Sequence, residues 1–119
     1  MAGARGEATI QTPDGEARIL FTNKALADAE RATGKTVLEL AGGARDGKLG
    51  VGDIAQLLLV GMEAARRDAR TGGRSHILND AWAVLDAVGF GTAAAAVIEA
   101  MAAVLNYEPG GEGESDPPV

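Results

Sequence analysis

The sequence predicts a mainly α-helical (α+β) domain in which an N-terminal β-hairpin is followed by a compact bundle of four to five helices. Three observations support this fold class. Residues 7–22 alternate polar and apolar side chains with a period of two, which is typical of strands that bury one face. Beyond residue 22 the alternation stops, and capping residues and glycines divide the chain into helix-length segments. Half of the last segment, residues 93–106, is alanine, which has the highest helix propensity.

The chain has 119 residues, which is the length of one ordinary domain. We expect a flexible leader over residues 1–6, followed by a single domain over residues 7–107 with its hairpin at 7–22 and its helices at 23–106. Residues 108–119 (EPGGEGESDPPV) hold four acidic residues and no basic ones, with Pro and Gly between them. Such a segment cannot bury enough apolar surface to fold, so it predicts a disordered acidic tail.

The predicted hairpin has one apolar face on each strand. The two faces hold Ala8, Ile10 and Thr12 on the first strand, and Ala17, Ile19 and Phe21 on the second. Between them, Pro13 fixes φ near −65° and Gly15 accepts the positive φ that a turn needs. We therefore expect a tight turn over residues 12–15.

Two short helices should follow the hairpin. Thr22 or Asn23 can cap the first, which runs to about Thr33 and is followed by Gly34 as its left-handed end residue. The second begins with the capping-box sequence Thr36-Val37-Leu38-Glu39. We expect it to end at Gly42 and Gly43, which open a glycine-rich loop over residues 42–50.

The third helix, which should begin near Gly50, is unusual in its middle. Between Ile54 and Met62 the only polar side chain is Gln56, so the helix is apolar on nearly every side. A helix of this kind is either the central helix of the domain or half of an interface. It then becomes charged over residues 63–70, where Arg66, Arg67 and Arg70 form part of a basic cluster. That cluster would either bind an acidic segment or simply be a solvated helix end.

The last two helices are separated by one glycine. The first should run from about Ile77 to Val88, with Gly89 after it. Thr92 should cap the second, which covers residues 93–106.

The composition excludes several chemistries. The chain has no Cys and one His, His76, so it offers neither a thiolate nor a multi-histidine metal site. Ser75 is next to His76, but neighbouring side chains diverge, and no triad is implied. A net charge of −6 argues against nucleic-acid binding. The apolar stretch from Phe90 to Tyr107 is interrupted by Glu99 and is too weak for a membrane span. We expect no enzyme activity, cofactor or metal, and no nucleic-acid or membrane partner.

Residues 42–48 (GGARDGK) match the outline of a phosphate-binding loop. Such a loop also needs Ser or Thr at the next position and a buried strand before it. Position 49 is Leu, and the preceding segment is a predicted helix. We therefore do not interpret the segment as a nucleotide site.

The two nearly all-apolar helices, 54–62 and 93–105, predict a protein-binding surface. Only 3% of the residues are aromatic, so the core lacks large side chains and an exposed apolar patch is expected. The predicted groove residues are Leu58, Leu59, Met62, Val97, Met101 and Val104, with Arg66, Arg67 and Arg70 at the rim. A homo-oligomer could also use this surface. Trp82 lies beside the apolar stripe of its helix and is expected in the core rather than at an interface.

The order of these segments resembles the tail assembly chaperone family of gene transfer agents and long-tailed bacteriophages, whose members are sometimes labelled tail tube proteins. The resemblance covers residues 5 to 106. It is carried by Arg5-Gly6-Glu7, Ala25-Leu26, Glu30, Thr33-Gly34, Val37-Leu38-Glu39-Leu40, Gly47-Lys48-Leu49, Asp53-Ile54-Ala55, and Ala81 to Gly89-Phe90 before the alanine-rich helix. Similar proteins often have Ser or Thr where Gly50 stands.

The resemblance implies a non-enzymatic assembly factor that acts in the cytoplasm of the bacterial host. It would bind the tape measure protein, keep its helices soluble while tail tube subunits polymerise around them, and be absent from the mature particle. A second hypothesis is a structural tail component, either a tail tube or a minor tail protein, that stays in the particle. An enzyme or a DNA-binding regulator would need clustered titratable or base-reading residues, and the sequence shows no such cluster.

Overall fold

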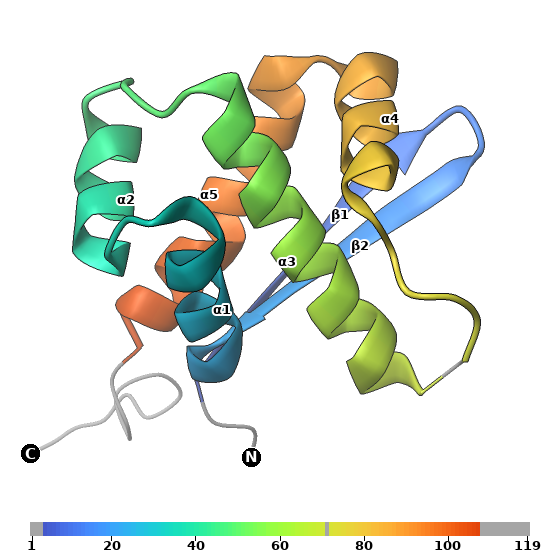
Figure 1. The fold of residues 1–119 in the computed structure, drawn as a ribbon, viewed down its shortest axis with the longest axis horizontal. Coiled ribbons are helices and arrows are strands. Elements are labelled where there is room, and N and C mark those ends of the chain that lie inside the picture. Colours follow the sequence, from blue (N-terminus) through green and yellow to red (C-terminus); the bar gives the residue numbers. More distant parts are fainter. Residues whose placement is uncertain (1–3, 71, 108–119) are drawn as a thin grey trace, which may run out of the picture.

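The N-terminal hairpin is followed by five helices, which confirms the predicted fold class. The computed structural model describes residues 4–70 and 72–107 (Figure 1). The proposed acidic tail, residues 108–119, therefore lies outside the described residues. In Figure 1, α3 runs diagonally in front of the hairpin, α4 lies near the hairpin turn, α2 lies at the left, and α5 runs behind α3 from beside α4 toward the lower left.

The hairpin consists of β1 (Arg5–Thr12) and β2 (Gly15–Thr22), which pair in an unbroken antiparallel register. Gly15 has φ = 140°, as the predicted turn requires. Because β1 begins at Arg5, the predicted leader over residues 1–6 is too long. Gly6 pairs with Phe21 within the sheet, although it has no side chain to contribute to the polar–apolar alternation.

One face of the hairpin carries the helices. Ile10, Ile19 and Phe21 are buried on this face, as the alternation predicts, and α5 packs mainly on β1 while α3 packs mainly on β2. On the opposite face, Glu7 and Arg18 are exposed to solvent, but Leu20, which pairs with Glu7, is buried.

Helix α1 (Asn23–Thr33) has the predicted boundaries. The Thr22 hydroxyl accepts a hydrogen bond from the Ala25 N–H at 3.1 Å, and Gly34 follows with φ = 73°. Both ends of the helix are thus set by the residues that the sequence singles out.

Helix α2 (Val37–Arg45) has the predicted capping box but a different end. Thr36 and Glu39 bond each other's backbone N–H groups, yet the helix continues through Gly42 and Gly43 instead of ending there. A glycine costs a helix only about 1 kcal/mol and leaves its backbone hydrogen bonds intact. The carbonyl oxygen of Gly42 accepts from Asp46 N–H at 3.0 Å, so the final turn is held in place.

Helix α3 (Val51–Ala69) is the central helix, which resolves the two alternatives left open by its sequence. It contacts β2, α1, α4 and α5. It begins after Gly50, which provides no side-chain cap. Gly61 faces β2 at short range, since a Cβ atom there would lie 2.3 Å from Ile19 Cγ2 and 3.1 Å from Phe21 Cε2.

Helices α4 (Leu78–Val88) and α5 (Phe90–Leu105) meet at Gly89, which has φ = 91°. The prediction that Thr92 caps the last helix is wrong, because α5 begins at Phe90 and Thr92 lies in its first turn. The glycine lets the chain turn so sharply that no additional linker is needed. Among the described residues no single helix could cross a membrane, and α4 and α5 reach the required length and hydropathy only as a pair bent by 118°.

The close approach at Gly61 predicts a position-specific loss of stability. Gly61→Ala should lower the free energy of unfolding by roughly 1–3 kcal/mol, because the new methyl group overlaps Ile19. Urea unfolding followed by circular dichroism measures the change. Gly52→Ala in the same helix is the matched control: its Cβ meets nothing within 4 Å, so it should be neutral or stabilising. Equal losses in the two variants would contradict this prediction.

Candidate protein-binding groove

The groove predicted from the sequence is part of the core. Leu58 and Val97 have no exposed surface, and Met62, Met101 and Val104 are each 5% exposed. Leu59 is half-buried. The assignment of these residues to an open partner-facing groove is therefore wrong, because the hairpin and the neighbouring helices cover this side of α3 and α5.

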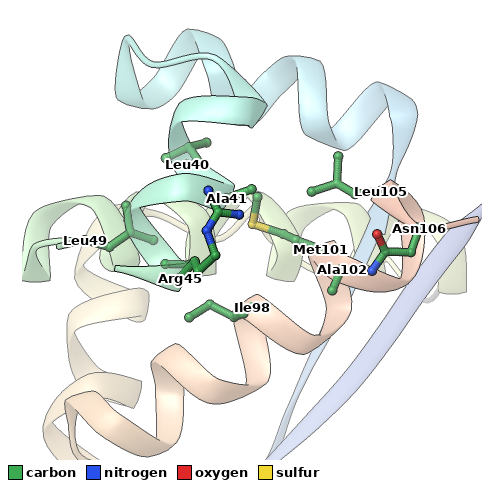
Figure 2. Close-up of a pocket in the computed structure, with 10 residues that line it drawn as sticks. Leu40, Ala41, Arg45, Leu49, Ile98, Met101, Ala102, Leu105 and Asn106 are labelled. Atoms are coloured by element: carbon green, nitrogen blue, oxygen red, sulfur yellow. The ribbon is translucent and has the colours of Figure 1, made fainter. Parts of the chain in front are cut away.

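The adjacent stripe of α5 is open instead. Ile98, Ala102 and Leu105 line a pocket of about 290 Å³ between α5 and α2 (Figure 2). The remaining lining residues are Leu40, Ala41, Ala44, Arg45, Leu49, Met101 and Asn106. Of the predicted groove residues, Met101 alone lines this pocket, and it does so from the buried side.

A second pocket, of about 90 Å³, extends the first toward the start of α5. The two pockets adjoin because they share Ala44, Leu49 and Ile98. The residues that line only the second pocket are Gly43, Gly47, Ile54, Phe90 and Ala94. We call the two pockets together the α2–α5 groove. It follows α5 from Phe90 to Asn106.

The groove exists because small side chains meet along it. Helix α2 buries a single residue, Leu40, against the rest of the protein. Ala41 and Ala44 of α2 also line the groove and are small, as are Ala94 and Ala102 of α5. Methyl groups on both sides cannot fill the space between two helices, so an apolar channel stays open to water.

The groove surface is apolar with two polar side chains. Arg45 and Asn106 line it, and no acidic residue of the described ranges does so. Figure 2 shows Arg45 between Leu49 and Met101. Within the described part of the chain, Arg45 forms no ion pair.

The predicted rim residues lie elsewhere, at the end of α3. Arg66 pairs with Glu63 at 3.0 Å, while Arg67 lies 3.6 Å from Glu63 and 3.9 Å from Asp28. Arg70 ends the helix with φ = 57°. None of the three lines the α2–α5 groove, so their assignment to its rim is also wrong.

Glu63 gives this basic cluster a structural role. Its carboxylate accepts two hydrogen bonds from Arg66 and one from the backbone N–H of His76. These bonds hold the pKa of Glu63 below its ordinary value, and the bonds from Arg66 have the largest effect. Since Arg66 also donates to the Ser75 hydroxyl at 3.2 Å, the cluster fastens the segment before α4 to α3.

The described residues form neither a cluster of metal ligands nor a phosphate-binding loop. Residues 4–70 and 72–107 contain no group of three or more His, Cys, Asp or Glu side chains that could hold a metal ion. Gly42 and Gly43 of the GGARDGK segment lie inside α2, and Gly47 follows that helix, so the strand that a phosphate-binding loop requires is missing before them.

Comparison of the chain with protein-family models, with curated proteins and with solved structures finds no match.

The sequence contains one signal that points to the observed groove. Helix α5 is apolar on both the Val97 and the Ile98 stripes, and α2 has Ala and Gly where a packed helix would carry large residues. Periodicity cannot decide which of two adjacent apolar stripes is buried, because both repeat at helical spacing.

The Glu63 contacts predict a pH-dependent loss of stability. Glu63→Gln should lower the free energy of unfolding by roughly 1–3 kcal/mol at neutral pH, since charge-assisted hydrogen bonds are lost. In the wild type this contribution is complete above the ordinary carboxyl pKa of 4.5. Because the folded-state pKa is lower, the contribution disappears as the pH falls through it. Urea unfolding at neutral pH and at pH 3 measures both effects.

Glu99→Gln is the control, since Glu99 is exposed on α5. The difference in stability between the Glu63 and Glu99 variants should shrink at pH 3. A stability difference that stays constant with pH would show that the charge of Glu63 does not contribute to the free energy of unfolding.

Proposed function

We propose that this protein is a non-enzymatic tail assembly chaperone of a phage or gene transfer agent, which binds the tape measure protein through the α2–α5 groove. It would keep that protein soluble in the bacterial cytoplasm until the tail tube subunits surround it. The order of sequence segments supports the family, and the groove supports the mode of binding.

The observation that carries this proposal is an apolar channel, open to water, along the whole of the last helix. Phe90 and Leu105, at the two ends of α5, are 41% and 36% exposed. An apolar groove between two helices is one of the surfaces into which a partner helix can lay its apolar face. A net charge of −6 would help to keep a complex with an aggregation-prone partner in solution.

A structural tail component is the second candidate, and the hairpin is the observation that favours it. The hairpin forms a sheet of only two strands, so each strand has one edge outside the β1–β2 pairing. Such edges can pair with strands of neighbouring subunits, as ring-forming tube proteins require. Mass spectrometry of purified particles separates the two functions, because a chaperone should be absent and a tail component should be present in stoichiometric amounts.

The proposed function predicts that one charge in the groove prevents partner binding. Ile98→Glu should reduce the amount of co-expressed tape measure protein that is soluble and co-purifies by at least roughly tenfold, because a carboxylate would be buried against an apolar helix. Leu38→Glu is the matched control: Leu38 is 76% exposed on α2 and lines neither pocket. Unfolding curves of both variants establish that they are folded.

Two results would contradict the chaperone function. One is a tape measure protein that stays insoluble with the wild-type chain. The other is a folded Ile98→Glu variant that retains the tape measure protein as well as the Leu38→Glu variant does.

A further inference from the structure

The walls of the α2–α5 groove limit what kind of chain can occupy it. The long walls are the helices α2 and α5, whose backbone N–H and C=O groups bond within their own helix, and the loop residues Gly47 and Leu49 complete the lining near Phe90. The polar side chains that line the groove are Arg45 and Asn106. An extended peptide would therefore bury backbone groups without partners, at a penalty for each group. A helix satisfies its own backbone and presents side chains alone.

From this we infer that the α2–α5 groove binds about four turns of a single amphipathic helix whose apolar face is flanked by a carboxylate that pairs with Arg45. This inference rests on the proposed function, because it takes the helix to belong to the tape measure protein. It adds the conformation, the length and the charge of the bound segment.

The length follows from the two exposed ends of the groove. Phe90 and Leu105 are the first and last residues of the 16-residue α5. At a rise of about 1.5 Å per residue they lie about 22 Å apart, which is about four helical turns. An apolar stripe of the same length on the partner would cover both side chains and the Ile98 region between them.

The carboxylate follows from the charge of the lining. Arg45 is the only charged residue that lines the groove, and the described chain provides no ion pair for it. An apolar partner without an acidic group would desolvate this guanidinium and give nothing in return. A Glu or Asp at the edge of the apolar face would instead form a charge-assisted hydrogen bond.

Cross-linking from two cysteines tests the conformation of the partner. The chain has no Cys, so Gly91→Cys and Asn106→Cys each create one reactive site near an end of the groove. A Cβ at Gly91 meets nothing within 4 Å, so the substitution fits. Each variant is labelled with a short thiol-linked photo-cross-linker after purification with the co-expressed tape measure protein, and the cross-linked residues are identified by mass spectrometry.

The two sites should cross-link to tape measure residues about 15 positions apart, since a helix advances about 1.5 Å per residue. Sites about seven positions apart would show an extended segment and overturn the inference. Cross-links between two copies of this chain would overturn it as well, because the groove would then be a dimer interface. If the wild-type chain does not retain the tape measure protein at all, the proposed function itself is wrong. The cross-linking results bear only on how the partner is bound.

Charge reversal tests the carboxylate. With the cross-linked segment as a synthetic peptide, Arg45→Glu should raise the Kd roughly fivefold to tenfold, whereas Arg45→Lys should stay close to the wild type. Arg31→Glu, the same charge change at a side chain of α1 that is 69% exposed, should leave the Kd unchanged. A peptide that binds Arg45→Glu as tightly as the wild type would overturn the pairing, even if Ile98→Glu still abolishes binding.

Discussion

The close contact between backbones on one face of the hairpin is the constraint on which the rest of the structure depends. A Cβ atom at Gly6 would lie 1.9 Å from the carbonyl oxygen of Ala100, and one at Gly61 would overlap Ile19. Glycine at these two points lets α5 lie directly on β1 and α3 directly on β2. The core has few aromatic residues to fill space, and these two glycines bring the helices close to the sheet around the buried aliphatic side chains and Phe21.

The same preference for small residues has the opposite effect at α2. This helix is anchored by Leu40, and the alanines that face α5 are too short to bridge the remaining distance. Small side chains therefore close one helix–sheet interface and leave one helix–helix interface open. The open interface between α2 and α5 provides the candidate site, so the low aromatic content bears on function as well as on stability.

Much of the fold could be predicted from the sequence because it depends on local chemistry. The alternation in residues 7–22, the Thr22 cap and the Thr36–Glu39 capping box each act within a few residues, and they are observed, with Leu20 as the exception to the alternation. The end of α2 and the start of α5 could not be predicted, because the glycines at 42, 43 and 89 are compatible with either a helix or its end. The site was misplaced for a different reason: which stripe of α5 is buried depends on how the hairpin packs, and that contact is distant in sequence.

The attachment of α2 has a consequence for how selective the groove can be. One wall, α5, is fixed on the hairpin, whereas the other is joined to the domain by the buried Leu40, the half-buried Val37 and the hydrogen bond from Val37 N–H to Glu30, and lies between Gly34 and Gly47, both with positive φ. Because it buries little surface, we expect α2 to open at a lower free energy than the whole domain unfolds. A wall that can shift admits helices whose apolar side chains differ in size. Binding would then depend on the spacing of apolar residues on the partner helix rather than on one amino-acid sequence. A single small protein could then cover many successive turns of a long partner, one copy beside the next.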